Sequence, residues 1–354
     1  MIRQVVGCMT GTSLDGLDTA LVAIEGTGLT MRARFVRGLS RPLGAVGGTL
    51  RRIAEQQPLS AREIAETMRD FSLLHAAVVR DLLAGAPCEL VAVHGQTVIH
   101  APPVSWQLFQ PAPLAQALGV DVIHDLRAAD LACGGQGAPI TPLADWILFR
   151  AAQTTRVVVN LGGFCNLTVL PAGGDASTVR GQDVCASNQL LDHLARRAFA
   201  TAYDAGGQRA LAGRPDAALV DRIAEALAIQ AHGRRSLGTG DELNRLIEAE
   251  LSQQRGEDVA RAACVALART IRIAGGEGEY VLAGGGVRNL ALRAEFAAAG
   301  AALTSDDLGV PADYREASAM AVLGALSRDR VAITLPQITG IPAPAPLAGC
   351  WTLP

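Results

Sequence analysis

A pattern of strand, glycine-rich turn and strand occurs twice in the chain, and it constrains the fold more than any other feature of the sequence. The first copy joins the apolar runs Arg3–Cys8 and Leu17–Ile24 through a polar turn. The second joins Arg156–Asn160 and Leu167–Leu170 through a turn that contains two glycines. The copies lie about 150 residues apart, which is close to the length of one domain. The sequence therefore predicts two related halves, each of which begins with a β-hairpin.

Helical and strand patterns alternate between and after these hairpins, which indicates an α/β fold. We expect helices over Leu43–Gln57, Ala61–Leu83, Pro139–Ala152, Asn188–Ala202, Asp216–Ala231, Glu257–Ala274 and Tyr314–Ser327, and strands over Leu90–Val93, Val120–His124 and Tyr280–Ala283. The glycine- and proline-rich stretch Gly134–Pro139 predicts the domain boundary. The expected parts are an N-terminal α/β domain (1–134), a second α/β domain (135–312), and a helix with an irregular proline-rich tail (313–354) that packs back on the body.

The composition excludes several classes of protein. All 31 lysine-or-arginine positions are arginines, so the lysine of a P-loop, of a protein kinase or of Schiff-base chemistry is missing. The net charge is −3 and the arginines are scattered, which argues against nucleic-acid binding. The seven cysteines form no C-x-x-C pair, so we expect neither a disulfide framework nor a zinc cluster. Without a signal peptide or an uninterrupted apolar helix, a cytoplasmic location away from membranes is expected.

The first turn has the residues of a phosphate and Mg²⁺ site. Its glycines let the backbone approach a ligand, its hydroxyl groups can donate hydrogen bonds, and its carboxylates can hold a divalent cation through water. These residues are Thr10, Gly11, Thr12, Ser13, Asp15, Gly16 and Asp18. An ordinary tight hairpin is the alternative for this one turn. The glycines at Gly162–Gly163 and Gly284–Gly286 also follow strands, and three such turns favour a ligand site.

Polar side chains follow two of the short strands. His94, Gln96 and Thr97 come after the strand at Leu90–Val93, where an α/β sheet binds ligands, and they suit sugar hydroxyls. Asp125, Arg127 and Asp130 come after the strand at Val120–His124. An arginine between two aspartates forms either an ion-pair network or a clamp for a substrate carboxylate.

Asp183 lies in a segment that we expect to be a loop before a helix capped by Ser187. It is either a turn residue or a general base presented to a substrate. Neighbouring Cys185 has no identifiable histidine partner, so a packed thiol is expected there.

Several of these strings, in the same order, resemble the anhydro-N-acetylmuramic acid kinase family over nearly the whole chain. They are Gly7-Cys8-Met9-Thr10-Gly11-Thr12-Ser13-Leu14-Asp15-Gly16-Leu17-Asp18, His94-Gly95-Gln96-Thr97, Asp125-Leu126-Arg127, Gly134-Gly135-Gln136-Gly137-Ala138-Pro139, Asn160-Leu161-Gly162-Gly163 and Gly284-Gly285-Gly286. The resemblance implies a two-domain actin-like ATPase fold, which is ribonuclease H-like, with a cleft for ATP and sugar between the domains.

The resemblance also implies the reaction and the roles of its residues. ATP and water convert 1,6-anhydro-N-acetylmuramic acid to the 6-phosphate during peptidoglycan recycling, and Asp183 is the catalytic base. The implied ATP-binding residues are Gly11, Thr12, Ser13, Leu14, Asp15, Gly16, Leu17, Asp18, Gly162, Gly163, Gly284, Gly285 and Gly286, with Asp15 at Mg²⁺. The implied substrate-binding residues are His94, Gln96, Thr97, Asp125 and Arg127. The implied partners are ATP and an anhydro amino sugar, and a homodimer is compatible with the resemblance.

Two segments depart from the family's usual pattern. Cys185-Ala186-Ser187-Asn188 stands where Gly-Pro-Gly-Asn is usual, and Gln107-Leu108-Phe109-Gln110 stands where Gln-hydrophobic-Gly-Asn is usual. Because side chains replace glycines, a kinase for another anhydrosugar and a non-catalytic ATP-binding sensor remain alternatives.

Overall fold

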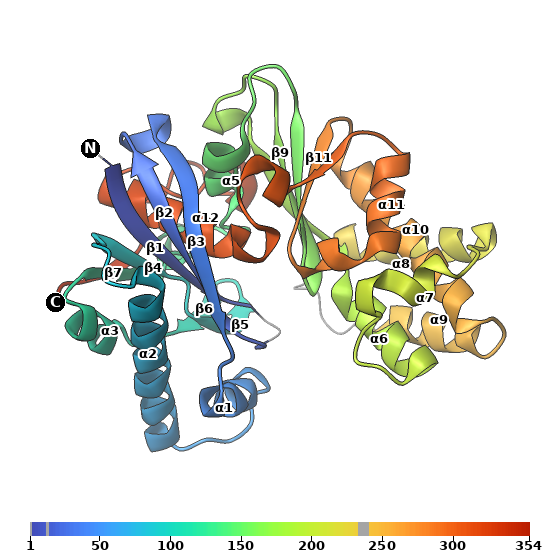
Figure 1. Ribbon diagram of the computed structural model, residues 1–354, viewed down its shortest axis with the longest axis horizontal. Helices are drawn as coiled ribbons and strands as arrows, with labels where there is room; N and C mark the ends of the chain where they lie inside the picture. The colour runs from blue at the N-terminus through green and yellow to red at the C-terminus, as the bar shows by residue number, and fades with distance from the viewer. Residues whose placement is uncertain (1, 12–13, 233–240) are drawn as a thin grey trace. The chain divides into compact units, whose positions relative to one another are not determined.

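A mixed sheet forms the centre of the first part of the chain (Figure 1). In the computed structural model, which describes residues 2–11, 14–232 and 241–354, its strand order is β13-β7-β4-β1-β2-β3. The strands are β1 (Ile2–Thr10), β2 (Leu17–Glu25), β3 (Arg32–Arg41), β4 (Leu90–Val93), β7 (Asp121–His124) and β13 (Cys350–Thr352). β1, β2 and β3 are antiparallel neighbours, whereas β1, β4 and β7 run parallel.

The second sheet repeats this arrangement with the order β10-β9-β8-β11-β12. Its strands are β8 (Arg156–Leu161), β9 (Phe164–Leu170), β10 (Arg180–Ala186), β11 (Glu279–Ala283) and β12 (Ala302–Thr304). Again three consecutive strands are antiparallel, and the first of them pairs in parallel with β11, which pairs in parallel with β12. When the first five strands of each sheet are numbered in chain order, both sheets have the order 3-2-1-4-5 of a ribonuclease H-like fold. In the first sheet, β13 adds a sixth strand beside β7. The predicted α/β class and the two related halves are confirmed.

The chain divides into two units, one around each sheet. Unit 1 comprises Met1–Phe149, Asp175–Val179 and Asp313–Pro354, and unit 2 comprises Arg150–Gly174 and Arg180–Ala312. The helices of unit 1 are α1 (Ala45–Ala54), α2 (Ala61–Leu83), α3 (Pro111–Leu118), α4 (Ala128–Ala132), α5 (Pro142–Phe149), α12 (Arg315–Arg328) and α13 (Pro336–Thr339), and it also contains the hairpin of β5 (Gln96–Ala101) and β6 (Val104–Leu108). Those of unit 2 are α6 (Asn188–Phe199), α7 (Gln208–Leu211), α8 (Ala217–His232), α9 (Asp241–Leu251), α10 (Gly256–Gly275) and α11 (Leu290–Ala298).

The two faces of the first sheet pack against different helices because side chains alternate along a strand. Val6 and Cys8 of β1 lie in one core with Phe71 of α2. Gly7, between them, faces α12, and a Cβ atom there would lie 1.9 Å from the Ala317 carbonyl oxygen. The glycine therefore lets the buried helix α12 lie directly on the sheet.

The stretch from Gly134 to Pro139, which we expected to be the domain boundary, lies inside unit 1. Asp130 holds this stretch, because one carboxylate oxygen accepts from the Gly137 N–H at 2.7 Å and the other from the Thr339 hydroxyl at 2.6 Å. Helix α5, which follows, packs on α12. Unit 1 consequently continues to Phe149 in its first segment.

The proline-rich tail is more regular than the sequence predicts. β13 pairs antiparallel with β7, with Cys350 opposite His124. Hydrogen bonding to backbone groups at the edge of β7 stabilises β13. No pattern of side chains in the sequence indicates this pairing. Among the described residues, no helix is both long and apolar enough to cross a membrane.

Candidate active site

The first turn connects β1 to β2 as expected. Within its described part, the Leu14 N–H donates to the Gly11 carbonyl oxygen at 3.2 Å, and Leu14 has a φ of +56°. The side chains of Leu14 and Leu17 lie in the core, so only their backbone groups can face a ligand. Asp15 is exposed. Thr12 and Ser13 lie outside the described residues.

Two polar groups at this end of β1 and β2 are held away from water. The buried Thr10 hydroxyl has no hydrogen-bond partner among the described residues. Asp18 is partly buried and accepts a hydrogen bond of 2.5 Å from the Ser40 hydroxyl. Burial raises the pKa of Asp18 to about 6; the Ser40 bond lowers it, and neighbouring carboxylates raise it.

The charges that act on Asp18 indicate what the turn can bind. In the described part of the chain, the charged groups that shift its pKa are all carboxylates, Asp15, Asp313 and Glu316. A divalent cation would relieve this repulsion, so the residues fit Mg²⁺. No cluster of three or more His, Cys, Asp or Glu side chains among the described residues is arranged to hold a metal directly.

Glu316, in the first turn of α12, was missed by the sequence analysis. Burial raises the pKa of Glu316. The charge of Arg315 lowers it, that of Asp145 raises it, and that of Arg127 lowers it by a smaller amount. Its signal in the sequence is an acidic residue directly before the apolar run Ala317–Leu326. Such an acid at the start of a buried helix is a candidate functional group.

The structure places His94 and Arg127 in contact. The His94 ring Nε2 lies 2.9 Å from an Arg127 terminal nitrogen, and its Nδ1 lies 2.8 Å from the Gly95 carbonyl oxygen. His94 is buried, and its pKa is lowered to about 3 by burial and then by the Arg127 charge. The imidazole is therefore neutral at physiological pH.

The neighbouring predicted residues provide polar groups for a ligand. Gln96 is buried and donates from its amide nitrogen to the Thr97 carbonyl oxygen at 3.1 Å, while its amide oxygen has no partner among the described residues. The Thr97 hydroxyl accepts from Gln107 at 3.4 Å. Asp125 has a φ of +56° after β7. The two carboxylate oxygens of Asp130 accept hydrogen bonds from the Gly137 N–H and the Thr339 hydroxyl.

In unit 2 the other two glycine-rich turns meet. The carbonyl oxygens of Gly163 and Gly162 accept from the first N–H groups of the α6 terminus, Ser187 at 2.9 Å and Asn188 at 3.0 Å. A Cβ atom at Gly284 would lie 2.7 Å from the Asn160 side-chain oxygen, and one at Gly286 would lie 3.0 Å from that of Asn188. Gly285, between them, is exposed in the short 3-10 helix Gly285–Arg288. Gly284 and Gly286 are therefore required for close packing, whatever the turn binds.

Asp183 lies on strand β10, whereas we expected a loop. It stands opposite Asn166 of β9, beside a β-bulge between Asp183 and Cys185, and its side chain is exposed. A bulge re-aims side chains, so the strand can present this carboxylate while its neighbours remain paired. Ser187 is at the N-cap position, but its side chain makes no capping bond. Burial raises the pKa of the Cys185 thiol to about 12, as a packed thiol requires.

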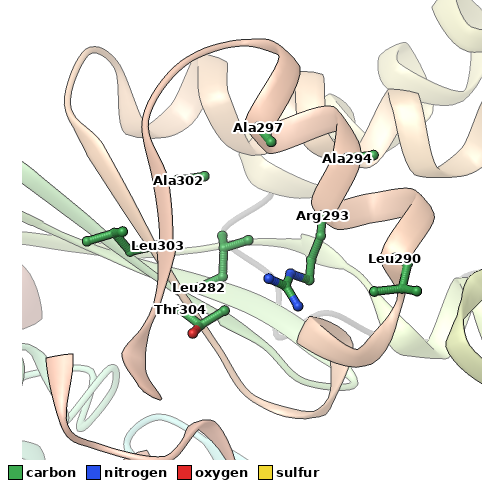
Figure 2. A pocket seen from close by; sticks show the side chains of 8 residues that line it. All are labelled: Leu282, Leu290, Arg293, Ala294, Ala297, Ala302, Leu303 and Thr304. Carbon is green, nitrogen blue, oxygen red and sulfur yellow. The ribbon is translucent and has the colours of Figure 1, made fainter. Parts of the chain in front are cut away.

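A cavity of about 280 Å³ lies elsewhere in unit 2, between α11, β11 and β12 (Figure 2). Arg293 points into it beside apolar side chains, among them Leu282 and Leu303. None of the predicted site residues lines this cavity.

Two units of ribonuclease H-like topology, with glycine-rich turns after their strands, define a protein of the actin-like ATPase class. The chain belongs to the anhydro-N-acetylmuramic acid kinase family, whose model matches residues 3–352. The resemblance stated from the motifs is thereby confirmed, and the chain is assigned to a family of kinases.

Two curated relatives from other organisms support this assignment. The chain is 35% identical to the anhydro-N-acetylmuramic acid kinase of Salinibacter ruber, with 98% of this chain and 95% of the relative covered. It is 33% identical to that of Gloeobacter violaceus, with 97% of each covered. Among solved structures, it is similar to component A of the (R)-2-hydroxyglutaryl-CoA dehydratase of Acidaminococcus fermentans, with a TM-score of 0.45, 13% identity and coverage of 91% and 98%. A ROK family glucokinase from Streptomyces griseus gives a TM-score of 0.40, 15% identity and coverage of 91% and 99%.

Proposed function

We propose that this protein uses ATP and Mg²⁺ to open 1,6-anhydro-N-acetylmuramic acid with water and to phosphorylate its O6, in peptidoglycan recycling. The observation that carries the proposal is the family match from residue 3 to residue 352. The product is N-acetylmuramic acid 6-phosphate, and ADP is released.

The reaction needs a base for water and a phosphoryl group held in line with the departing oxygen. The water oxygen forms a bond to the anomeric carbon, the bond from that carbon to the bridging oxygen breaks, and the bridging oxygen takes the γ-phosphoryl group. We assign Asp183 as the base that accepts the proton from water. Its exposed carboxylate on β10 supports this role.

We assign the ATP phosphates to the first turn. We assign Mg²⁺ to the carboxylates of this turn, and to Asp15 in particular. The carboxylates that raise the pKa of Asp18 support the cation site. The family resemblance also assigns Gly162–Gly163 and Gly284–Gly286 of unit 2 to ATP binding. Bound Mg²⁺ would neutralise phosphate charge, while the chain's own residues orient the nucleotide.

The anhydro sugar is assigned to the polar residues after β4 and β7. The amide oxygen of Gln96, which has no partner in the described part of the chain, supports this, because a buried polar group without a protein partner is usually completed by a ligand or water. Thr97 and Asp125 offer further hydrogen-bonding groups.

The departure at Cys185 is compatible with activity. Cys185 lies in the core of unit 2 with Val184 and Leu190, so its side chain adds no bulk at the exposed Asp183. This packing favours the kinase over the non-catalytic sensor.

Product analysis tests the proposal. The protein is incubated with Mg-ATP and 1,6-anhydro-N-acetylmuramic acid in heavy-oxygen water, and phosphorus NMR and mass spectrometry follow the products. We expect a new phosphate monoester, equimolar ADP, and label at the anomeric carbon at early times. ATP binding without turnover would support the sensor, and turnover only of an anhydrosugar without the acid group would support the other kinase.

A further inference from the structure

Ser40 of β3 links the Asp18 carboxylate to the residue that precedes α12. Ser40 and Asp18 stand opposite each other in the antiparallel pairing of β3 with β2, and the Ser40 hydroxyl donates to Asp18 Oδ1 at 2.5 Å. The Ser40 oxygen also lies 3.4 Å from the hydroxyl oxygen of Tyr314. A serine hydroxyl has one proton, and that of Ser40 points to Asp18, so the Tyr314 hydroxyl can donate to the Ser40 oxygen. The two hydroxyl groups therefore form a chain that ends on the Asp18 carboxylate.

Packing within unit 1 holds the Tyr314 ring in this place. The ring stacks on that of Phe35, with the centroids 5.7 Å apart and an angle of 19° between the planes. A Cβ atom at Gly38 would lie 2.5 Å from the Tyr314 ring, so the glycine leaves the space that the ring fills. The next residue, Arg315, is buried in its ion pair with Asp145 and anchors the backbone. The Tyr314 hydroxyl is consequently presented to Ser40 from a fixed position.

The charges around Asp18 make such support necessary. The carboxylates of Asp15, Asp313 and Glu316 all act against the charged form of Asp18, whereas the hydrogen bond from Ser40 favours it. That bond engages Oδ1 and so opposes rotation of the carboxylate away from its neighbours. A charged carboxylate with a fixed orientation at the end of the first turn is suited to a divalent cation.

We propose that Ser40 and Tyr314 are positioning residues that orient the Asp18 carboxylate toward the Mg²⁺ of bound Mg-ATP. The inference rests on the proposed function and deepens it, because it adds to the nucleotide site two residues that lie outside the first turn. Both act through Asp18 and need not contact ATP. A carboxylate that is already held loses less conformational freedom when a cation binds, so this support should raise the affinity for the cation.

The test measures how strongly Mg²⁺ tightens the binding of a non-hydrolysable ATP analogue. Calorimetry gives the dissociation constant of the analogue with EDTA and with saturating Mg²⁺, and the ratio of the first to the second is the metal effect. Ser40→Ala removes the hydrogen bond to Asp18 and should lower the metal effect by about threefold to tenfold, with the affinity in EDTA unchanged. Titration with Mn²⁺, followed by electron paramagnetic resonance, should show the same loss of cation binding without turnover.

Conservative substitutions separate positioning from a structural role. Ser40→Thr keeps the hydroxyl group and should restore the metal effect. Tyr314→Phe keeps the ring that stacks on Phe35 but removes its hydroxyl, so it should lower the metal effect less than Ser40→Ala does. Ser177→Ala is the matched control, because the Ser177 hydroxyl also donates to an aspartate, Asp175, at 2.6 Å. Its loss should leave the metal effect unchanged.

Product analysis of the same variants separates this inference from the proposed function. Turnover of the anhydro sugar with an unchanged metal effect in Ser40→Ala would overturn the inference and leave the function standing. A lowered metal effect that Ser40→Thr restores, in a protein that turns over no anhydrosugar, would support the inference and reject the kinase. Equal weakening with EDTA and with Mg²⁺ in Ser40→Ala would indicate a structural role and overturn the inference. A wild type that binds the analogue equally under both conditions, or under neither, would also overturn it.

Discussion

Arg315 and Asp145, which lie 170 positions apart in the chain, form an ion pair that is almost completely closed to water. Their side chains are 1% and 0% exposed, and Arg315 Nε donates to Asp145 Oδ1 at 2.9 Å. The same guanidinium also donates to the Thr141 hydroxyl at 3.1 Å. The pair joins the first turn of α5 to that of α12 within unit 1.

Arg315→Met should destabilise the protein by about 3–5 kcal/mol, because it leaves the Asp145 carboxylate buried without its partner. Urea unfolding at neutral pH measures this. Arg269→Met, which breaks an exposed pair with Asp221, should cost no more than about 1 kcal/mol. Equal effects of the two substitutions would contradict the proposed importance of burial.

Gly7→Ala should destabilise unit 1 by at least about 1–3 kcal/mol, the usual cost of overpacking. Its Cβ atom would lie 1.9 Å from the Ala317 carbonyl oxygen and 2.5 Å from the Ala321 nitrogen, and neither backbone atom can move independently. Gly48→Ala in α1 is the control, since no atom lies within 4 Å of its Cβ position. It should stabilise the helix by roughly 0.5–1 kcal/mol. Thermal and urea unfolding of both variants would test the difference.

Asp18→Asn should stabilise the ligand-free protein, and the gain should grow with pH. Burial raises the pKa of Asp18 from 3.8 to about 6, so between these values the folded protein binds a proton that the unfolded chain releases. Stability of the wild type therefore falls as pH rises through this window, and Asn removes the loss. The gain should be small at pH 4 and reach up to about 3 kcal/mol above pH 6.

Asp175→Asn provides a control of opposite sign. Hydrogen bonds from the Ser177 side chain and backbone lower the pKa of the exposed Asp175, so its charged form favours folding at neutral pH. Its replacement should therefore destabilise the protein at neutral pH and have less effect as the pH falls. Urea unfolding between pH 4 and pH 8 compares the two variants, and a pH-independent effect of Asp18→Asn would disprove the assigned cause.

Asp183→Asn should reduce turnover by a factor of about 10² or more while ATP and sugar still bind, because the amide cannot accept the proton from water. Steady-state kinetics and calorimetry measure the two effects. Asp221→Asn replaces another exposed aspartate of unit 2 and should leave turnover unchanged. Full activity of Asp183→Asn would reject the base assignment.

Thiol labelling of the folded protein should modify Cys133 first and Cys350 more slowly. Both are exposed, but burial and the Asp125 charge raise the pKa of Cys350 and so reduce its thiolate. Cys8, Cys165, Cys185 and Cys264 are buried and should react only on unfolding. Peptide mapping after timed labelling tests this order, and early labelling of Cys185 would contradict its placement in the core.

The predicted architecture depends mainly on local patterns, and these were sufficient for part of the regular elements. The apolar run and polar face of Ala61–Leu83 predicted a helix, which is present over the same residues and begins with a capping box of Ser60 and Glu63. The hairpin around Gly162–Gly163 and the glycine turn after β11 were also found from sequence. Periodicity and turn chemistry determine such elements within a few neighbouring residues.

The strands at Arg180–Ala186 and Cys350–Thr352 were not predicted, because their stabilising partners lie elsewhere in the chain. β10 depends on pairing with β9, and this pairing placed Asp183 on a strand. β13 depends on the open edge of β7. No local pattern distinguishes these residues from a loop.

By itself, the sequence determined the α/β class, the two halves, the glycine-rich turns and the family, since each rests on residue order or local periodicity. Only the tertiary structure decided that Arg127 contacts the neutral His94, that Asp130 holds the glycine-rich stretch, and that α5 belongs to unit 1. These contacts join residues distant in the chain, and their energies come from burial and charge. Burial and charge pairing depend on which atoms surround a side chain, and that is fixed only when the chain has folded.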